Sequence, residues 1–382
     1  MNQKLKVLII GNYRFERNIS MKCYADLLIT ELLGRGVEVK CKTPFPIFGR
    51  LKPAAYGLGK WLGYIDRFII FTVYLYINSK KYDICHIVDH CNSLYIPFLR
   101  SKTHIVTCHD LIGIKSALDP NADFRPRLMG RLLQRLILLG LRSAKNIVCV
   151  SNHTRFELGL IDSFDFKRRR VWVVLSALRY RFSRVDTISS TVKNTKLRSL
   201  QPYVLHVGSN MWYKNRLGLA KIYHNLVTQE GFSTLKLVIA GERLEPHVYQ
   251  WLCLHGHHDN IVQIEDIQDR ELQQLYSGSE CLIFPSLIEG FGWPIIEAQA
   301  CGCAVATSRR PPMDEVAGDG AIYIDPMAPD VAARIIARNL SRNKEELVNA
   351  GLLNAERYTL EQMIDKYMTI YMEIAQCHGV AL

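Results

Sequence analysis

Short apolar runs recur along the chain, and most are followed by a stretch with helical spacing. In the first half they fall at residues 6–11, 37–39, 84–88, 104–108, 146–150 and 171–175. In the second half they fall at residues 203–208, 236–241, 261–264, 281–284 and 304–307. Continuous apolar runs of this kind are typical of parallel strands that are buried on both faces. Strands that alternate with helices predict doubly wound α/β domains.

A polar stretch without apolar period interrupts this pattern once, and the pattern then starts again, which predicts two domains. A chain of 382 residues with 48% hydrophobic content also exceeds the roughly 250 to 300 residues at which a single core stops growing. The boundaries that we predict are 1–185 for the N-terminal domain, 186–199 for a linker, 200–358 for the C-terminal domain and 359–382 for a terminal helix.

Charge is distributed unevenly between the two halves. Residues 1–180 hold 29 Lys and Arg against 13 Asp and Glu (+16), and the remainder holds 19 against 23 (−4), which gives the net +12. A basic half favours an anionic partner, either a phospholipid surface, a lipid-linked phosphate or nucleic acid. Residues 125–139 combine arginines with a leucine-rich face, which suits either a helix at a membrane interface or a core helix with solvated arginines. Nucleic acid is disfavoured, because no module of that kind is recognisable.

Cysteine usage and the N-terminus predict a cytoplasmic protein. The 11 cysteines form no C-x-x-C pair, so we interpret them as reduced packing residues. The first six residues lead directly into an apolar strand, and the longest apolar run, 68–77, is shorter than the roughly 20 residues of a membrane span. We expect a cytoplasmic location with peripheral contact to the inner face of the membrane.

Residues 285–298 form the most informative segment, because a glycine-rich loop there joins an apolar strand to a helix. Gly290 and Gly292 free the loop, and Pro294 suits the first turn of the helix. The amides of Gly290, Phe291 and Gly292 then face the carboxyl edge of the sheet together with the positive end of the helix dipole. An anionic phosphate is stabilised at such a place without a metal.

Two carboxylates flank this loop and predict two different roles. Glu297, inside the helix, can accept two hydrogen bonds from a ribose diol, whereas Glu289, in the loop, points toward a transferred group. Two further candidates for donor binding are Gly208, in the glycine turn that ends a strand, and Lys214, which follows that turn. As a compact point charge, Lys214 can stabilise a departing diphosphate, although a lone lysine is more often an ordinary surface residue.

The segment Glu-Gly-Phe-Gly-x-Pro-x-x-Glu-Ala at 289–298 resembles the signature of the retaining glycosyltransferases of family 4, the glycosyl transferases group 1. The resemblance covers nearly the whole chain. It implies the GT-B fold, with two facing Rossmann-like domains and an interdomain cleft. The first domain then takes the acceptor, the second binds a nucleoside-diphosphate sugar, and the terminal helix packs back on the first domain.

The same resemblance assigns further residues and leaves two departures. His109, at the end of a strand, is similar to the histidine that meets the transferred sugar, with Asp110 orienting its loop. The backbone after Ile264 corresponds to the nucleobase pocket, and Gly11 to a donor contact, although a plain strand-ending role is as good an interpretation. The family's arginine after the first glycine of the second domain is replaced by Ser209, and its glycine pair by residues 18–19. Arg216 is a candidate to replace that arginine.

The resemblance, together with these features, implies a retaining, metal-independent hexosyltransferase that uses a nucleotide-sugar donor and a saccharide or lipid-linked saccharide acceptor, in bacterial surface polysaccharide or lipopolysaccharide synthesis. No cofactor and no metal are expected, because the chain has no Asp-x-Asp pair, and the histidines at 255–258 lack a partner cluster with zinc spacing. Two alternatives remain: a catalytically degenerate binding protein with this fold, favoured by the departures above, and a sugar-nucleotide epimerase, which needs no acceptor.

Overall fold

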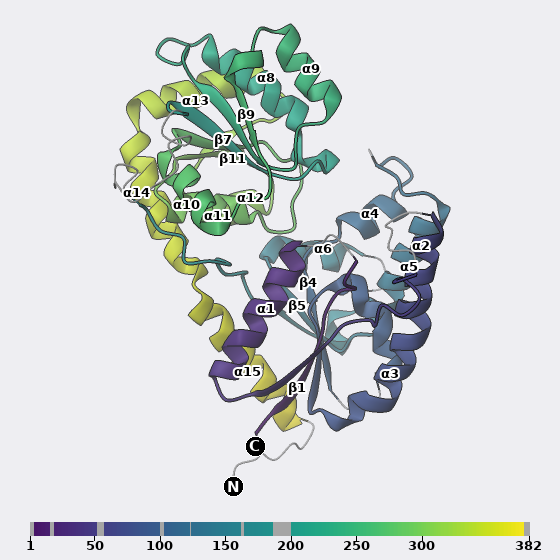
Figure 1. Cartoon of the computed structure of the whole chain (residues 1–382). Helices are drawn as coiled ribbons and strands as arrows, with labels where there is room; N and C mark the ends of the chain where they lie inside the picture. The colour runs from purple at the N-terminus through teal and green to yellow at the C-terminus, as the bar shows by residue number, and fades with distance from the viewer. Residues whose placement is uncertain are drawn as a thin grey trace. The chain divides into compact units, whose positions relative to one another are not determined.

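The fold was analysed in a computed structural model, shown in Figure 1. It describes residues 4–15, 19–51, 57–99, 103–122, 124–161, 164–185 and 200–377. The predicted linker, 186–199, and Asn18 lie outside these residues. Contacts divide the chain into two compact units: an N-terminal unit of 1–179 with 360–382, and a C-terminal unit of 180–359.

The N-terminal unit is built on a six-stranded parallel sheet in the order β2-β1-β3-β4-β5-β6. Its strands are β1 (Lys6–Ile10), β2 (Glu38–Lys42), β3 (Ile84–Ile87), β4 (His104–Cys108), β5 (Asn146–Cys149) and β6 (Arg170–Val173). The four central strands are almost wholly buried because helices cover both faces. The prediction of a doubly wound α/β domain is confirmed here.

Helices cover the two faces of this sheet in separate layers. They are α1 (Ile19–Gly34), α2 (Gly57–Ile65), α3 (Phe71–Asn78), α4 (Ile112–Leu118), α5 (Leu128–Ser143), α6 (Asn152–Leu160) and α15 (Leu360–Cys377), with a π-helical turn, Asp66–Ile70, and the 3-10 helices η2 (Ser79–Lys81), η3 (His90–Phe98) and η4 (Phe166–Arg168). One core joins the sheet to α3, η3, α5 and α6. Figure 1 shows α1 and α15 side by side on the opposite face.

The terminal helix α15 belongs to the N-terminal unit because a buried polar network holds it there. The Tyr371 hydroxyl lies 2.6 Å from Nδ1 of His86 on β3, and the Tyr367 hydroxyl lies 3.0 Å from the Thr107 hydroxyl on β4. Tyr24 of α1 also contacts Tyr367 through its hydroxyl at 2.5 Å. Hydrogen bonds of this kind satisfy polar groups that burial would otherwise leave unpaired.

The C-terminal unit repeats the plan with the strand order β12-β11-β10-β7-β8-β9, again all parallel. Its strands are β7 (Tyr203–Gly208), β8 (Lys236–Gly241), β9 (Ile261–Ile264), β10 (Cys281–Phe284), β11 (Val305–Ser308) and β12 (Ile322–Ile324). The three-residue β12 is a strand that the sequence pattern did not predict, because it is too short to show a period.

Two helical layers enclose this second sheet. The helices are α8 (Arg216–Val227), α9 (Pro246–Leu254), α10 (Asp269–Gly278), α11 (Trp293–Ala300), α12 (Met313–Ala317), α13 (Pro329–Arg342) and α14 (Lys344–Ala355), with the 3-10 helices η5 (Trp212–Lys214), η6 (His258–Asn260) and η7 (Glu356–Tyr358). A single core joins the sheet to α8, α9 and α13. The helices α10, α11 and α12 contact one another in sequence.

Each sheet has one point at which the strand order reverses, and these points locate the sites. In the N-terminal unit the reversal lies between β1 and β3, and in the C-terminal unit between β7 and β10. Open α/β sheets bind ligands in the crevice outside the carboxyl ends of the strands at such a switch point. The loops after β1 and β3, and those after β7 and β10, are therefore where functional side chains are expected.

Candidate active site

A buried ion pair occupies the switch point of the C-terminal unit. Lys214 lies in η5, in the loop after β7, and Glu289 lies in the loop after β10. The ammonium of Lys214 donates to Oε1 of Glu289 at 2.7 Å, and the two side chains are 11% and 8% exposed. Because desolvating two charges offsets much of their attraction, a buried ion pair is weak evidence for a stabilising role. Its place at the edge where such sheets bind ligands makes the pair a candidate for function.

An aromatic ring gives the Lys214 ammonium a second contact. Nζ lies 4.7 Å from the ring centroid of Phe284, the last residue of β10. A cation over the face of an aromatic ring is electrostatically attracted to it. The ammonium thus keeps a favourable contact at the sheet edge when Glu289 turns to another group, and a diphosphate can take the place of that carboxylate.

The glycine-rich loop after β10 leads directly into α11. Gly292 has a φ of 101°, which a β-carbon disfavours, and it is the last residue before the helix. Phe291 is buried, so the loop is anchored, and Pro294 lies in the first turn, where no amide is needed. Gly290 and Gly292 therefore lead into a helix N-terminus that follows β10, the arrangement expected for holding an anion.

Glu297 lies in the second turn of α11 and is buried. Its Oε2 accepts a hydrogen bond of 2.9 Å from the hydroxyl of Tyr276 on α10. Tyr276 is itself fully buried, which fixes the carboxylate in one orientation. Sequence reasoning missed Tyr276, and no local signal could have found it, because a tyrosine on the apolar face of a helix is usually a core residue.

Arg216 holds two loops of the C-terminal unit together. Its guanidinium is buried and donates to the Gly208 carbonyl at 2.6 Å. It also donates to the carbonyls of Glu242 and Arg243, after β8. Backbone carbonyls therefore already use this side chain, which argues against Arg216 as a replacement for the arginine missing at Ser209.

Ile264 ends β9 at the outer edge of the same sheet and is half-buried. Around it, the side chain of Gln263 accepts a hydrogen bond from the Leu244 amide at 2.7 Å, and Arg243 pairs with Glu265. These side chains are engaged with one another, so a nucleobase at this edge would meet mainly main-chain groups. The base-binding role of Ile264 stays a prediction.

His109 follows β4 in the N-terminal unit and is buried. Its Nε2 lies 2.8 Å from the Val88 carbonyl oxygen. Because a carbonyl only accepts, Nε2 carries the proton, and Nδ1 is the acceptor of the neutral ring. Burial lowers the pKa of His109, although the charge of Asp89 acts in the opposite direction. At neutral pH the imidazole is therefore neutral and can accept a hydrogen bond from a sugar hydroxyl.

Two other predicted residues of this unit have local roles in the structure. The Gly11 amide donates to the Lys42 carbonyl at 3.0 Å, and a β-carbon at Gly11 would lie 3.2 Å from Thr43. The Asp110 carboxylate accepts from the Ile112 amide at 3.0 Å, which orients the loop before α4. A donor contact of Gly11 stays a prediction.

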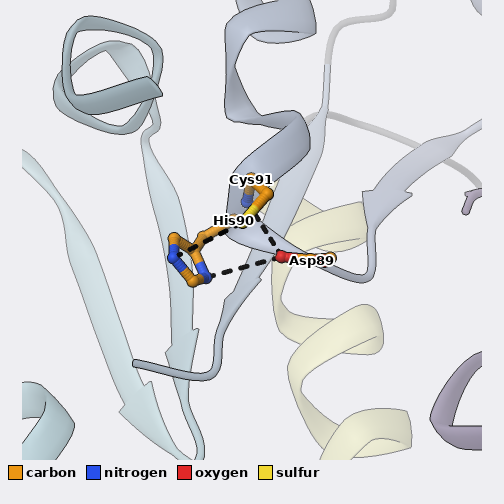
Figure 2. Close-up of side chains that lie close together, drawn as sticks. All are labelled: Asp89, His90 and Cys91. Carbon is orange, nitrogen blue, oxygen red and sulfur yellow. Dashed lines mark hydrogen bonds and ion pairs between the residues drawn. The ribbon is translucent and has the colours of Figure 1, made fainter. Parts of the chain in front are cut away.

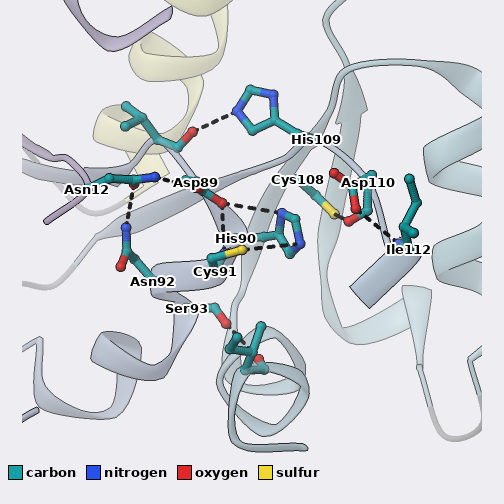
Figure 3. A network of polar contacts seen from close by, with 12 residues as sticks. Asn12, Asp89, His90, Cys91, Asn92, Ser93, Cys108, His109, Asp110 and Ile112 are labelled. Carbon is teal, nitrogen blue, oxygen red and sulfur yellow. Dashed lines mark hydrogen bonds and ion pairs between the residues drawn. The ribbon is translucent and has the colours of Figure 1, made fainter. Parts of the chain in front are cut away.

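Figure 3 shows a polar network at the N-terminal switch point that sequence reasoning missed. It connects Asn12, after β1, with Asp89 and Asn92, after β3. The signal was present in the sequence, because Asp89 follows an apolar strand just as His109 does. An acidic residue just after a strand is a candidate for ligand binding on the same grounds as the histidine.

Asp89, His90 and Cys91 offer three atoms that metals bind, all within 4.8 Å of one another (Figure 2). Their contacts use opposite sides of the imidazole: Oδ1 of Asp89 lies 3.6 Å from Nδ1, and the Cys91 sulfur lies 3.9 Å from Nε2. One ion cannot be bound through both ring nitrogens. Both oxygens of Asp89 also accept hydrogen bonds, so the cluster is better described as a hydrogen-bonded network than as a metal site.

The chain is similar in sequence to known glycosyltransferases. Residues 189–351 match the family model of the glycosyl transferases group 1. O-antigen chain mannosyltransferase B of Escherichia coli is 26% identical over 289 residues, which cover 74% of each chain. O-antigen chain mannosyltransferase RfbU of Salmonella typhimurium is 25% identical over 231 residues, 60% of this chain and 58% of that one.

Solved structures share the whole architecture. Sucrose-phosphate synthase from Thermosynechococcus elongatus superposes with a TM-score of 0.76 at 16% identity, covering 98% of this chain and 100% of that one. Anabaena Alr3699/HepE, solved in complex with UDP and glucose, gives 0.68 at 14% identity, covering 97% and 100%. At these identities the likeness concerns the fold, and it confirms the predicted two-domain GT-B fold.

The fold and the similar sequences together indicate a two-domain α/β glycosyltransferase of the GT-B type. Residues 189–351, most of the C-terminal unit, match the model of the glycosyl transferases group 1. The resemblance drawn from residues 289–298 is therefore confirmed at the level of this group, and the chain is an enzyme.

Proposed function

We propose that the chain is a retaining, metal-independent mannosyltransferase. It moves mannose from a nucleoside-diphosphate sugar to a saccharide or lipid-linked saccharide acceptor in the synthesis of a surface polysaccharide or lipopolysaccharide. Mannose is favoured over other hexoses because the two relatives named above are O-antigen mannosyltransferases. A further relative, the serotype-specific mannosyltransferase WbdA of Escherichia coli, matches 82% of this chain and 38% of its own length. The nucleotide sugar is the substrate, and no other cofactor is proposed.

The observation that carries this proposal is the ion pair between Lys214 and Glu289 at the C-terminal switch point. Departure of a nucleoside diphosphate builds negative charge on its phosphate oxygens. A fixed ammonium and the amides of 290–292 stabilise that charge without reorganising, which is the largest single contribution in many enzymes. Lys214 thereby takes the part that a divalent cation plays elsewhere.

Roles are proposed for the remaining side chains, unit by unit. Glu297 holds the ribose hydroxyls, and Glu289, released from Lys214, approaches the sugar and favours positive charge on its anomeric carbon. His109 accepts a hydrogen bond from a hydroxyl through Nδ1, the nitrogen that its contact with Val88 leaves as the acceptor. No described side chain is assigned as a covalent nucleophile. Retention is therefore proposed through attack on the face that the diphosphate leaves.

A panel of nucleotide sugars tests the donor. The full chain is incubated with GDP-mannose, UDP-glucose, UDP-galactose or UDP-N-acetylglucosamine and with octyl α-mannoside as acceptor, and released nucleoside diphosphate is measured. We expect turnover with GDP-mannose and an α-linked product by NMR, because the donor is itself α-linked. A β-linked product contradicts retention. Binding without turnover supports the degenerate binding protein, and a changed sugar without acceptor supports the epimerase.

The surface of α5 supports an anionic membrane as partner of the N-terminal unit. Only its inner side is buried, whereas Leu128, Leu132, Leu136 and Leu139 are 47% to 73% exposed. These spacings place them on one side of the helix, and Arg127 and Arg135 are exposed beside them. An apolar stripe flanked by arginines suits a helix lying in the headgroup region, where each arginine contributes about 1 kcal/mol.

Sedimentation with vesicles tests this surface. The full chain should bind phosphatidylglycerol vesicles more tightly than phosphatidylcholine vesicles, and L132S/L139S should weaken that binding by about tenfold, since each lost leucine contact contributes about 1 kcal/mol or less when half-exposed. The matched control is Leu254→Ser, at an exposed leucine of α9 in the other unit. Equal binding of the two variants contradicts the proposed membrane surface. No helix among the described residues is long and apolar enough to span a bilayer.

A further inference from the structure

Asp89 lies at the switch point of the N-terminal sheet, two residues after β3, and is buried. Across the reversal of strand order, Asn12 lies two residues after β1. Neither residue has a role in the transfer chemistry above. A buried carboxylate at the edge where such sheets bind ligands calls for a physical account, because burial disfavours its charge.

The carboxylate of Asp89 is held from two directions. Its Oδ2 accepts a hydrogen bond of 2.6 Å from Nδ2 of Asn12, and its Oδ1 accepts one of 2.9 Å from the Cys91 amide at the start of η3. The Asn12 side chain is in turn held, because its Oδ1 accepts from Nδ2 of Asn92 at 2.7 Å. Figure 3 shows these hydrogen bonds, which connect the loop after β1 to the segment after β3.

The main chain beside Asp89 also contacts His109. Val88, directly before Asp89, supplies the carbonyl that accepts from Nε2 of His109 at 2.8 Å. On another side, the ring of Tyr24 meets the imidazole edge-on with centroids 4.8 Å apart. The orientation of His109 is therefore set by the position of the Val88 carbonyl, and that position depends on how the next residue is held.

The charge of Asp89 also favours a role beside His109. Burial alone would raise the pKa of Asp89, but the neighbouring His90 and His109 and the hydrogen bonds from Asn12 and the Cys91 amide lower it below its ordinary value. Asp89 is thus a carboxylate at neutral pH. A negative charge beside the ring favours any positive charge that develops on His109 during transfer.

We propose that Asp89 is a positioning residue for His109: pinned between the loops after β1 and β3, it holds the Val88 carbonyl that orients the imidazole toward the acceptor side. This inference rests on the proposed glycosyl transfer. It adds to it a residue that acts through His109 and contacts no substrate itself.

The test compares Asp89→Asn, His109→Gln and the double variant in the full chain, with the donor that the wild type turns over and octyl α-mannoside. We expect Asp89→Asn to lower kcat by about 10- to 100-fold, since misplacement of a reacting group by about 1 Å has an effect of this size. The KM for the donor and the thermal shift with the nucleoside diphosphate should stay within about twofold, because both report on the other unit. The double variant should be no slower than His109→Gln, because both changes remove the same interaction.

The matched control is Asp165→Asn. Asp165 caps the 3-10 helix η4 through the same kind of bond, from the Lys167 amide at 2.8 Å, but it is exposed and lies before β6, away from the switch point. It should leave kcat unchanged. A loss of activity in Asp165→Asn equal to that in Asp89→Asn would overturn the inference, because capping alone would then explain it.

Further outcomes keep the inference separate from the proposed function and from folding. An inactive wild type contradicts the proposed function before any variant is compared. A wild-type kcat for Asp89→Asn or for His109→Gln, or a double variant whose losses multiply, overturns the positioning role. Where Asp89→Asn does not fold, Asn12→Ala removes one of its two anchors. It should then lower kcat severalfold, again with no further loss when combined with His109→Gln.

Discussion

At the switch point of the C-terminal unit a lysine and a glutamate form a direct ion pair, whereas at that of the N-terminal unit an aspartate is held by amide groups beside two histidines. The overall charges run the opposite way. Residues 1–180 carry +16 and the remainder −4, yet the cation lies in the acidic half and the carboxylate in the basic half. The charge of a domain therefore does not identify the charge that its ligand meets.

The basic charge of the N-terminal half is placed elsewhere, on surfaces such as that of α5. A site with a carboxylate and a neutral histidine suits hydroxyl groups and disfavours phosphates. A site with an ammonium and open amides suits a diphosphate. On the proposed function, each unit binds one of the two substrates at the switch point of its own sheet, and the predictions below test this division.

The largest effect is expected for Lys214→Ala. Without its ammonium the departing diphosphate loses its only proposed charged partner, and Glu289 is left buried without its counter-ion. We expect kcat to fall by about 10²- to 10³-fold, as on removal of one preorganised charge-stabilising group. Initial rates of nucleoside diphosphate release measure this. Lys221→Ala, at an exposed lysine of α8, is the control, and a Lys214→Ala rate within threefold of it would contradict the division.

The next effect concerns donor affinity and is confined to the C-terminal unit. Glu297→Ala should raise the donor KM by about 10- to 100-fold, because a hydrogen bond to a charged group contributes about 1.5 to 3 kcal/mol. Tyr276→Phe should raise it by about 3- to 10-fold, since it removes only the bond that orients this carboxylate. Tyr323→Phe loses a hydroxyl contact to the Gly318 carbonyl away from the switch point and should leave KM unchanged. Calorimetric titration with nucleoside diphosphate separates these cases.

A smaller effect, a loss of folding stability at low pH, is expected in both units. Burial lowers the pKa of His86 on β3 and of His206 on β7 to about 3. Between that value and the ordinary value of about 6.5, the unfolded chain binds protons that the folded chain does not. Stability should therefore be full above pH 6.5 and fall with decreasing pH by up to about 1.4 kcal/mol per pH unit for each histidine.

Unfolding midpoints between pH 7.5 and 4.5 measure this slope. His206→Gln should make it shallower, because one of the buried titrating groups is gone, whereas His247→Gln, at an exposed position, should not. A slope that is the same in all three chains would show that other groups control acid unfolding. That result would contradict the expected effect of buried histidines on stability in both units, but it would leave the proposed division of substrates untouched.

Much of the fold and one half of the site could be predicted from the sequence. The strands β4, β7, β8, β9 and β10 begin and end where their apolar runs do. The C-terminal site was predictable because a helix start, two glycines and two carboxylates lie within fourteen consecutive residues. Local chemistry of that kind is readable without knowing which strands are neighbours.

The N-terminal site was only partly predictable, because its residues are far apart in sequence. Asn12 and Asp89 are separated by 77 positions and meet only because β1 and β3 are neighbours in the sheet. Arg216 shows the same limit: its place after Ser209 suggested phosphate binding, but three backbone carbonyls, one at the end of β7 and two after β8, already use its guanidinium. What the sequence did not reveal is which loops share an edge.

The smallest effect, and the one that tests both switch points together, is expected on removal of metals. If Lys214 and the amides of 290–292 stabilise the diphosphate, and if Asp89, His90 and Cys91 form a hydrogen-bonded network, then EDTA should change neither kcat nor the melting temperature. Dialysis against EDTA, followed by assays with and without added magnesium, manganese or zinc, measures this. Rates that depend strictly on magnesium or manganese would show that the C-terminal charge is insufficient. A melting temperature that falls with EDTA and returns with zinc would instead identify Asp89, His90 and Cys91 as a metal site. The N-terminal switch point would then hold a cation and not a free carboxylate, contrary to the comparison above.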